Sequence, residues 1–170
     1  LAASDHPNLS DFEIFVSGSE AMARAIYQNF RLRGVADDLR AHRRRLLLWD
    51  CYRPFSVQEA LWAQLPDPRF VAPPMRSSTG QPRAGSRHNR AVAVDVGVVD
   101  EHGAAVVLPT EHDAMTPAAA RSRALADGAP GADEAARLDA AMRAHGFTPI
   151  SSEWWHFDLP GDYPLLEVPL

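Results

Sequence analysis

The chain has 170 residues, of which 46% are hydrophobic and 23% are charged, a composition that suits a globular protein with one sizeable core. Its formal net charge of -5 argues against a general nucleic-acid-binding protein, which is usually basic. No apolar run approaches the length that spans a bilayer, so we expect a single domain over residues 1–170 without a membrane span.

Cys51 is the only cysteine, which excludes an internal disulfide and is typical of a reducing compartment. Because exported bacterial proteins can also lack disulfides, the bacterial cytoplasm and the periplasm both stay open, with the cytoplasm favoured. The sequence predicts no particular oligomeric state.

The first predicted elements are two helices. Residues 17–20 (Ser-Gly-Ser-Glu) have the spacing of a capping box, which marks the start of a helix. The four-residue recurrence of Met22, Ile26 and Phe30 predicts its inward face. We expect a second, short helix over about residues 35–44, with its arginines in solvent.

A strand and a third helix are expected next. Residues 46–49 form an uninterrupted apolar run, which predicts a buried strand that ends before Pro54. A second capping-box pattern at residues 56–59 predicts a helix whose inward residues are Val57, Leu61 and Leu65. Residues 66–85 are rich in Pro, Ser and Gly without periodicity, which predicts a functional or disordered loop.

The following segment is expected to form a hairpin. Residues 91–99 alternate small and β-branched side chains, as in a strand, and residues 101–103 (Glu-His-Gly) form a turn. The turn leads to an apolar run at residues 105–108, which we expect to pair with the strand. Residues 114–131 are expected to be irregular.

The chain is expected to end with a helix and a strand. Asp133 suits the first turn of that helix, Leu138 and Met142 face inward, and Gly146 provides a left-handed cap. The last strand carries residues 153–157. Strands paired across turns, with helices before and after them, predict an α+β fold with helices packed around a mostly antiparallel central sheet.

Two polar clusters, far apart in the sequence, have the composition of one metal site. A catalytic zinc needs three nitrogen or oxygen ligands and an open position for water. It also needs a nearby base that is not a ligand, to take the proton of that water. His88, Asp95 and His156 can be the ligands, and Glu153 can be the base.

The spacing of these residues limits their geometry. His88 and Asp95 are an odd number of residues apart, so we expect His88 in the turn before a strand and Asp95 within it. Asp95 interrupts an apolar strand, which is costly unless the carboxylate is paired or bound to a cation. Glu153 and His156 also have odd separation, and a bulge or bend between them would bring both to one site.

Each of these residues has an ordinary explanation when taken singly. An isolated histidine such as His88 is more often a surface or hydrogen-bonded side chain than a ligand. Asp95 could pair with Arg87 or Arg90, and Arg53 could be a solvated charge or part of a salt bridge. Only the joint pattern favours a functional site.

At these residues the chain resembles the zinc D-alanyl-D-alanine dipeptidases of the glycopeptide-resistance type, which are related to D,D-carboxypeptidases and to the hedgehog fold. The family pattern is Asp-Gly-Tyr-Arg-Pro after a strand, then Ser-x-His with Asp seven residues after the His, then Glu-Trp-Trp-His. The corresponding segments here are residues 50–54, 86–95 and 153–156. Their order and approximate separations match from about residue 46 to residue 157.

The resemblance implies roles for the matching residues. One zinc ion would be held by His88, Asp95 and His156. Glu153 would be the general base and then the general acid. Arg53 would stabilise the tetrahedral intermediate or its oxyanion.

On the substrate side, the resemblance implies that Ser86 and Tyr52 help to bind substrate. Asp113 lies near the family acid that receives the substrate ammonium. It ends a segment, residues 108–113, that departs from the family's Met-Gly-Ser/Thr-x-Phe-Asp. Cys51 and Ala91 also stand where the family has glycine, changes that touch substrate specificity more than metal binding.

The sequence therefore predicts a zinc metallopeptidase that hydrolyses small D-alanyl-D-alanine-type dipeptides with Glu153 as general base. One alternative is a D,D-carboxypeptidase or endopeptidase acting on longer peptidoglycan peptides, against which Asp113 and the loop over residues 66–85 argue. Another is a non-catalytic zinc-binding interaction domain, which would need neither Glu153 nor Arg53.

Overall fold

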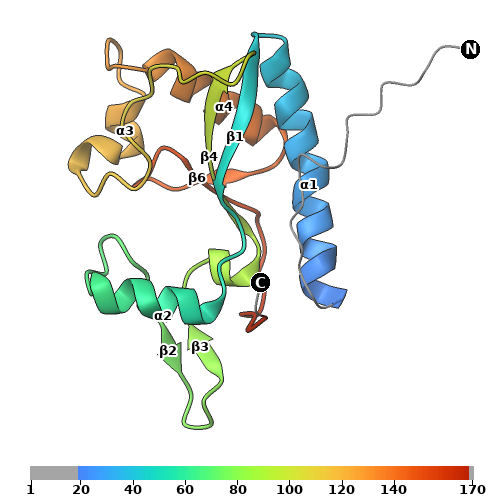
Figure 1. The fold of residues 1–170 in the computed structure, drawn as a ribbon, viewed down its shortest axis with the longest axis vertical. Coiled ribbons are helices and arrows are strands. Elements are labelled where there is room, and N and C mark those ends of the chain that lie inside the picture. The colour runs from blue at the N-terminus through green and yellow to red at the C-terminus, as the bar shows by residue number, and fades with distance from the viewer. Residues whose placement is uncertain (1–18, 169–170) are drawn as a thin grey trace, which may run out of the picture.

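The protein is described by a computed structural model that covers residues 19–168, with side chains described from residue 28 onwards. The main sheet has the strand order β1-β4-β6-β5, and each neighbouring pair is antiparallel. Helices pack around this sheet, which confirms the predicted α+β class (Figure 1). The strands are β1 (Arg44–Asp50), β4 (Ala93–Asp100), β5 (Thr148–Pro149) and β6 (His156–Asp158).

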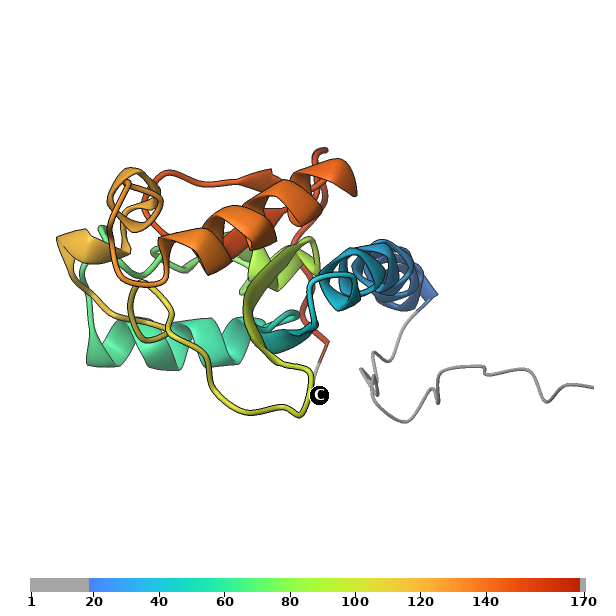
Figure 2. The same cartoon turned by 90° about the horizontal axis from the view of Figure 1, so that it is seen from above.

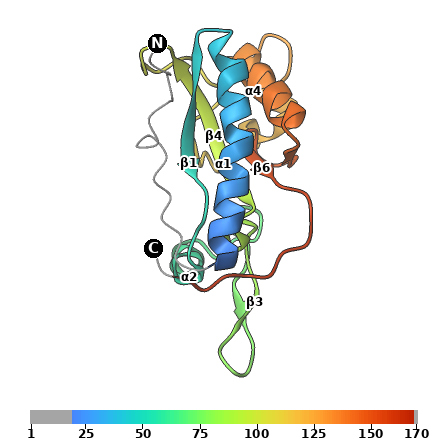
Figure 3. The same ribbon diagram turned by 90° about the vertical axis from the view of Figure 1, so that its right-hand side faces the viewer.

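Two helices, α1 (Ser19–Arg40) and α4 (Ala132–Ala144), lie side by side on one face of the sheet (Figure 2 and Figure 3). Side chains from both helices and from alternate residues of β4 form one buried cluster that includes Leu32, Leu39, Val94, Val96, Val98, Leu138 and Met142. Because successive residues of a strand face opposite sides, Asp95 and Gly97 point away from these helices.

The prediction of two N-terminal helices was wrong. Helix α1 is continuous through residue 40, and β1 begins where the second helix was expected to end. Its buried face is Gln28, Leu32, Val35 and Leu39, whereas Phe30 is 76% exposed. A strict four-residue spacing drifts around a helix of 3.6 residues per turn, so the recurrence that ends at Phe30 does not follow the buried face. The capping-box residue Ser17 and the side chains of Met22 and Ile26 lie outside the described part.

Strand β1 is present as predicted but is not fully buried. It is an edge strand, and its apolar residues are only partly covered. An apolar run alone cannot distinguish a central strand from an edge strand that is covered on its faces. The register slips between Leu48 and Asp50, opposite β4, where the chain leaves the sheet.

Helix α2 (Phe55–Gln64) begins directly after Pro54, and its buried residues are Phe55 and Gln58. Val57 and Leu65 are exposed, so the predicted inward face was wrong. In Figure 1, α2 lies below the main sheet, beside the hairpin of β2 (Met75–Arg76) and β3 (Pro82–Ala84). Part of the predicted loop over residues 66–85 is therefore ordered as a hairpin.

Three other segments differ from expectation. The predicted strand over residues 105–108 is reduced to a single bridge between Val99 and Ala105. Residues 114–131 contain two short helical segments, η3 (Pro117–Ala119) and α3 (Arg121–Ala124). The last strand is shorter than predicted and starts at His156.

The C-terminal helix was predicted correctly. Helix α4 buries Leu138 and Met142, and Gly146 has the left-handed φ of 80° after its end. Within residues 19–168, no helix combines the length and apolar character needed to cross a membrane.

Candidate metal centre

Three side chains meet on the face of the sheet opposite α1 and α4. Asp95 of β4 and His156 of β6 are direct partners in the strand register. His88 comes from the short helix η2 (His88–Arg90), in the turn before β4, as predicted. One possible ligand atom from each of the three residues lies within 4.8 Å of the others, and all three side chains are buried.

Hydrogen bonds fix which nitrogen of each histidine faces the centre. His88 Nδ1 lies 2.8 Å from the carbonyl oxygen of Cys51, which can only accept, so Nδ1 carries the proton. Similarly, His156 Nε2 lies 3.1 Å from Asp158 Oδ1, a carboxylate oxygen that accepts, so Nε2 carries a proton. The remaining nitrogens, His88 Nε2 and His156 Nδ1, lie 3.2 Å apart and both approach the carboxylate of Asp95.

This set of atoms fits a metal ion. Two imidazole nitrogens and a carboxylate are directed at one point, and each histidine donates its other ring nitrogen to an acceptor behind it. Such outer partners are usual for metal-bound histidines. Two histidines and one carboxylate are also the protein ligands of one class of hydrolytic zinc sites.

The charges in the cluster are strongly coupled. Burial by itself lowers the pKa of His156, but hydrogen bonds with Asp158 and Asp95 outweigh it and raise the value to about 9. Burial raises the pKa of Asp95, but the polar contacts with His112, His156 and His88 outweigh it and hold that pKa far below its usual range. Asp95 is therefore a carboxylate, ready to bind a cation.

Glu153 stands beside the cluster. It lies in the bend that precedes β6, which is the irregularity the odd spacing required. One of its carboxylate oxygens is 3.8 Å from His156 Nδ1. Burial raises the pKa of Glu153, and the nearby Asp95 adds to the shift. A carboxylate with a raised pKa is suited to accept a proton and return it.

Arg53 enters the same cavity from the segment between β1 and α2. Its Nε and Nη2 both donate to Asp50 Oδ2, at 3.0 and 2.6 Å. Its Nη1 donates to Gln58, whose amide in turn donates to the carbonyl oxygen of Ala72. These bonds hold the guanidinium in one orientation.

A cavity of about 300 Å³ is lined by the residues described above that carry the chemistry, namely Arg53, His88, Asp95, Glu153 and His156. Ser86 and Asp113 line it as well, and the Asp113 side chain is 62% exposed. The predicted substrate residue Tyr52 does not line it. Its buried hydroxyl donates to the carbonyl oxygen of Val168 and accepts from the Val168 amide, so Tyr52 instead holds the C-terminal segment.

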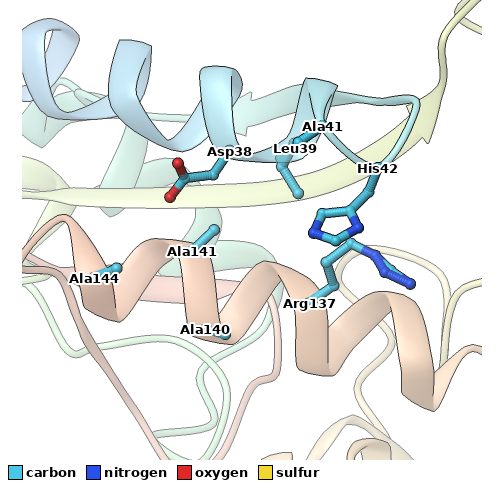
Figure 4. Close-up of a pocket in the computed structure, with 8 residues that line it drawn as sticks. All are labelled: Asp38, Leu39, Ala41, His42, Arg137, Ala140, Ala141 and Ala144. Carbon is cyan, nitrogen blue, oxygen red and sulfur yellow. The ribbon is translucent and has the colours of Figure 1, made fainter.

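A second hollow, of about 400 Å³, lies between α1 and α4 (Figure 4). Alanines form much of its wall, with Asp38, His42 and Arg137 at its sides. None of the candidate ligands His88, Asp95 and His156 lines it, and its polar groups do not converge on one point. This hollow therefore lacks a cluster of catalytic groups like the one in the cavity around His156.

Sequence reasoning missed Asp158. Its carboxylate accepts from His156 Nε2, and Arg87 lies behind it with Nε 3.4 Å from Asp158 Oδ1. Arg87 also donates to the carbonyl oxygens of Leu159 and Gly161, so it ties this strand end together. The signal was available, because residues two apart on a strand share a face.

Sequence reasoning also missed Arg121. Its buried guanidinium donates to the carbonyl oxygens of Ile150, Trp154 and His156 and contacts Asp139. It also lies 4.6 Å from the ring centre of Phe157. These carbonyl oxygens belong to the backbone segment that carries Glu153 and His156, so Arg121 fixes the path of that segment. No sequence pattern pointed to it.

Comparison with known proteins agrees with this geometry. A family model described as D-ala-D-ala dipeptidase matches residues 21–168. A D-alanyl-D-alanine dipeptidase of Escherichia coli (strain K12) is 39% identical over 126 residues, which cover 72% of this chain. The aligned segment covers 60% of the length of that relative. The match over nearly all of the described residues confirms the family resemblance: this chain belongs to the D-Ala-D-Ala dipeptidase family of peptidases.

Proposed function

We propose that this chain is a single zinc peptidase domain that hydrolyses D-alanyl-D-alanine-type dipeptides. The observation that carries the proposal is the buried group His88, Asp95 and His156, with Glu153 next to it in one cavity. The name of the Escherichia coli relative supports a dipeptide as the substrate class.

A bound zinc ion would supply Lewis acidity, which polarises the scissile carbonyl and acidifies a water molecule. Glu153 takes the proton of the attacking water and returns it to the leaving amine. Its partly buried position, with a raised pKa, suits both steps. Arg53, held by Asp50 and Gln58, faces the oxyanion that develops as water attacks.

The two ends of a dipeptide need opposite partners. We propose that Asp113 receives the free ammonium and that Ser86 helps to bind the rest of the substrate. Both residues line the cavity. An N-acylated peptide has no ammonium and leaves Asp113 without its charged partner. Because the Asp113 side chain is 62% exposed, the loss of this ion pair would cost up to about 1 kcal/mol of binding.

The test is an assay of purified, zinc-loaded protein on D-Ala-D-Ala, its N-acetyl form and an N-acylated tripeptide. We expect the free dipeptide to have the highest kcat/KM. Asp113→Asn should lower the ratio of kcat/KM for the free dipeptide to that for its N-acetyl form. Asparagine tolerates the left-handed conformation of residue 113, where φ is 56°, so this variant keeps the local backbone. A preference of the wild type for N-blocked peptides would replace the dipeptidase proposal by a carboxypeptidase.

The metal part is tested separately by metal analysis. His156→Ala should lose nearly all bound zinc, because two remaining ligands hold the ion poorly. Unchanged zinc content in this variant would remove the central claim.

A further inference from the structure

The mechanism above leaves unused one imidazole that lies next to Asp95. His112 lies next to Asp113, and its side chain is 23% exposed. Its Nε2 atom is completely buried, and within the described residues no group meets it with normal hydrogen-bond geometry. A buried ring nitrogen without a partner is unusual in a native protein, so its position calls for a reason.

His112 Nε2 is directed at carboxylates. Asp95 Oδ2 and Asp113 Oδ1 each lie 3.5 Å from it. An unprotonated nitrogen would be repelled by two carboxylate oxygens, so this geometry requires the proton on Nε2. A movement of about 0.5 Å toward Asp95 turns the approach into an ordinary hydrogen bond.

Packing on both sides determines the orientation of the His112 ring. It stacks on Trp49, with ring centres 4.7 Å apart and 16° between the planes, and Trp155 meets its edge. Trp49 in turn lies against Gly97 of β4. A Cβ atom at that glycine would come within 2.3 Å of the Trp49 ring. The strand thus keeps a glycine where the support of the His112 ring needs room.

Asp95 needs a donor of this kind. Each of the two histidines has an acceptor behind it, the Cys51 carbonyl for His88 and Asp158 for His156. When His88 Nε2 and His156 Nδ1 bind a metal ion together with one oxygen of Asp95, neither nitrogen carries a proton that it could donate to the second oxygen. Among the described side chains near that oxygen, His112 is the one that can do so.

We propose that His112 is a positioning residue that donates from Nε2 to the second carboxylate oxygen of Asp95 and thereby raises the affinity of the site for its metal ion. This inference rests on the metal site of the proposed function. His112 stands where the family pattern has phenylalanine. A phenylalanine ring can only pack there, whereas the imidazole of His112 can also donate to the proposed ligand Asp95.

The test compares two replacements by their zinc affinity, measured by competition with a chromophoric chelator. His112→Phe keeps a ring against Trp49 and Trp155 but removes the donor. We expect its zinc affinity to fall about 10- to 100-fold, as for the loss of other outer partners of ligands. His112→Gln has a donor at a similar reach and should recover part of the loss. A purely structural role predicts the opposite order, because glutamine does not stack.

A matched control is His102→Phe, at an exposed histidine of the turn after β4, which should leave zinc affinity unchanged. X-ray absorption at the zinc edge should count two imidazole ligands in the wild type. A count of three would make His112 itself a ligand and overturn the inference. Equal affinities of wild type and H112F overturn this inference alone, whereas wild-type protein that binds no zinc overturns the proposed function as well.

Discussion

At the scale of single residues, the site depends on which atom of each side chain is already engaged. The Cys51 carbonyl and Asp158 occupy one nitrogen of His88 and of His156, so the other nitrogen of each is left for the centre. Any residue at position 51 could supply that carbonyl, so the replacement of the family glycine by Cys51 leaves this contact intact. Burial raises the pKa of the Cys51 thiol to about 12, so the thiol of the metal-free protein is protonated at neutral pH.

Replacing Glu153 should separate metal binding from turnover. Glu153→Gln has nearly the same shape but cannot accept the proton of water. We expect zinc content to stay the same and kcat to fall about 100- to 10,000-fold. Metal analysis and steady-state kinetics on the same preparation check this. Wild-type turnover in the variant would show that another group takes the proton.

Arg53 offers a second residue-scale prediction. If its charge acts on the transition state, Arg53→Ala should lower kcat by about 100- to 1,000-fold. The accompanying rise in KM should be smaller than this loss. Arg53→Lys should rescue little, because an ammonium group cannot donate to Asp50 and Gln58 in the same planar arrangement. An effect on KM alone would make Arg53 an anchor for the substrate carboxylate instead.

At the scale of elements, short irregular segments place the proposed ligands where regular strands cannot. Helix η2 is followed by Ala91, whose φ of 52° and ψ of 40° are left-handed. This turn delivers His88 to the same face as Asp95 despite their odd spacing. The bend over residues 153–155 does the same for Glu153 and His156, and Arg121 holds that bend through its carbonyl oxygens.

Ala91 gives an element-scale prediction for stability. Ala91→Gly relieves a left-handed conformation that costs about 1–2 kcal/mol, which stabilises the fold. Two effects oppose this gain: the loss of a buried methyl group worth about 0.8 kcal/mol, and the greater chain entropy that glycine gives the unfolded state. We expect the free energy of unfolding to change by less than about 1 kcal/mol. Ala91→Val should lose about 2 kcal/mol or more, because a β-branched side chain is strained and crowded there.

Urea unfolding followed by circular dichroism measures both variants. The relative order matters more than either value. If valine at position 91 were as stable as alanine, the left-handed turn before β4 would not be the structure that the folded protein adopts.

At the scale of the whole molecule, the site joins a segment around residues 88–95 with residues 153–156, which are distant from it in the sequence. His88, Asp95 and His156 come from η2, β4 and β6, and Arg53 and Asp113 add two more segments to the same cavity. Since the unfolded chain cannot keep these residues together, a metal ion that binds only the folded state stabilises the whole domain.

Removal of the metal ion should therefore lower the melting temperature. At a free zinc concentration about 100 times the dissociation constant, binding contributes about 2.7 kcal/mol, which corresponds to a shift of about 5–11 °C for a domain of this size. Differential scanning calorimetry with zinc or with a chelator measures the shift. His156→Ala is the matched control and should melt at the same temperature in both solutions.

The sequence by itself determined the composition of the site and the type of fold. The identities and the odd spacings of His88, Asp95, Glu153 and His156 already required a turn before one strand and a bend before another, because side-chain direction along a strand follows from covalent geometry. Strand β4 and helix α4 were predictable for the same reason, since each carries a regular pattern of apolar residues.

Only the tertiary structure decided which side chains support that site and which faces are buried. The contact of His112 with Asp95, the carbonyl partners of Arg121 and the position of β1 at the sheet edge all depend on segments far apart in the chain. Periodicity within one segment cannot report what packs against it, which is why Phe30, Val57 and Leu65 were expected inside and lie in solvent. Local sequence fixes the direction of a side chain, whereas its partner is fixed by the packing of the whole domain.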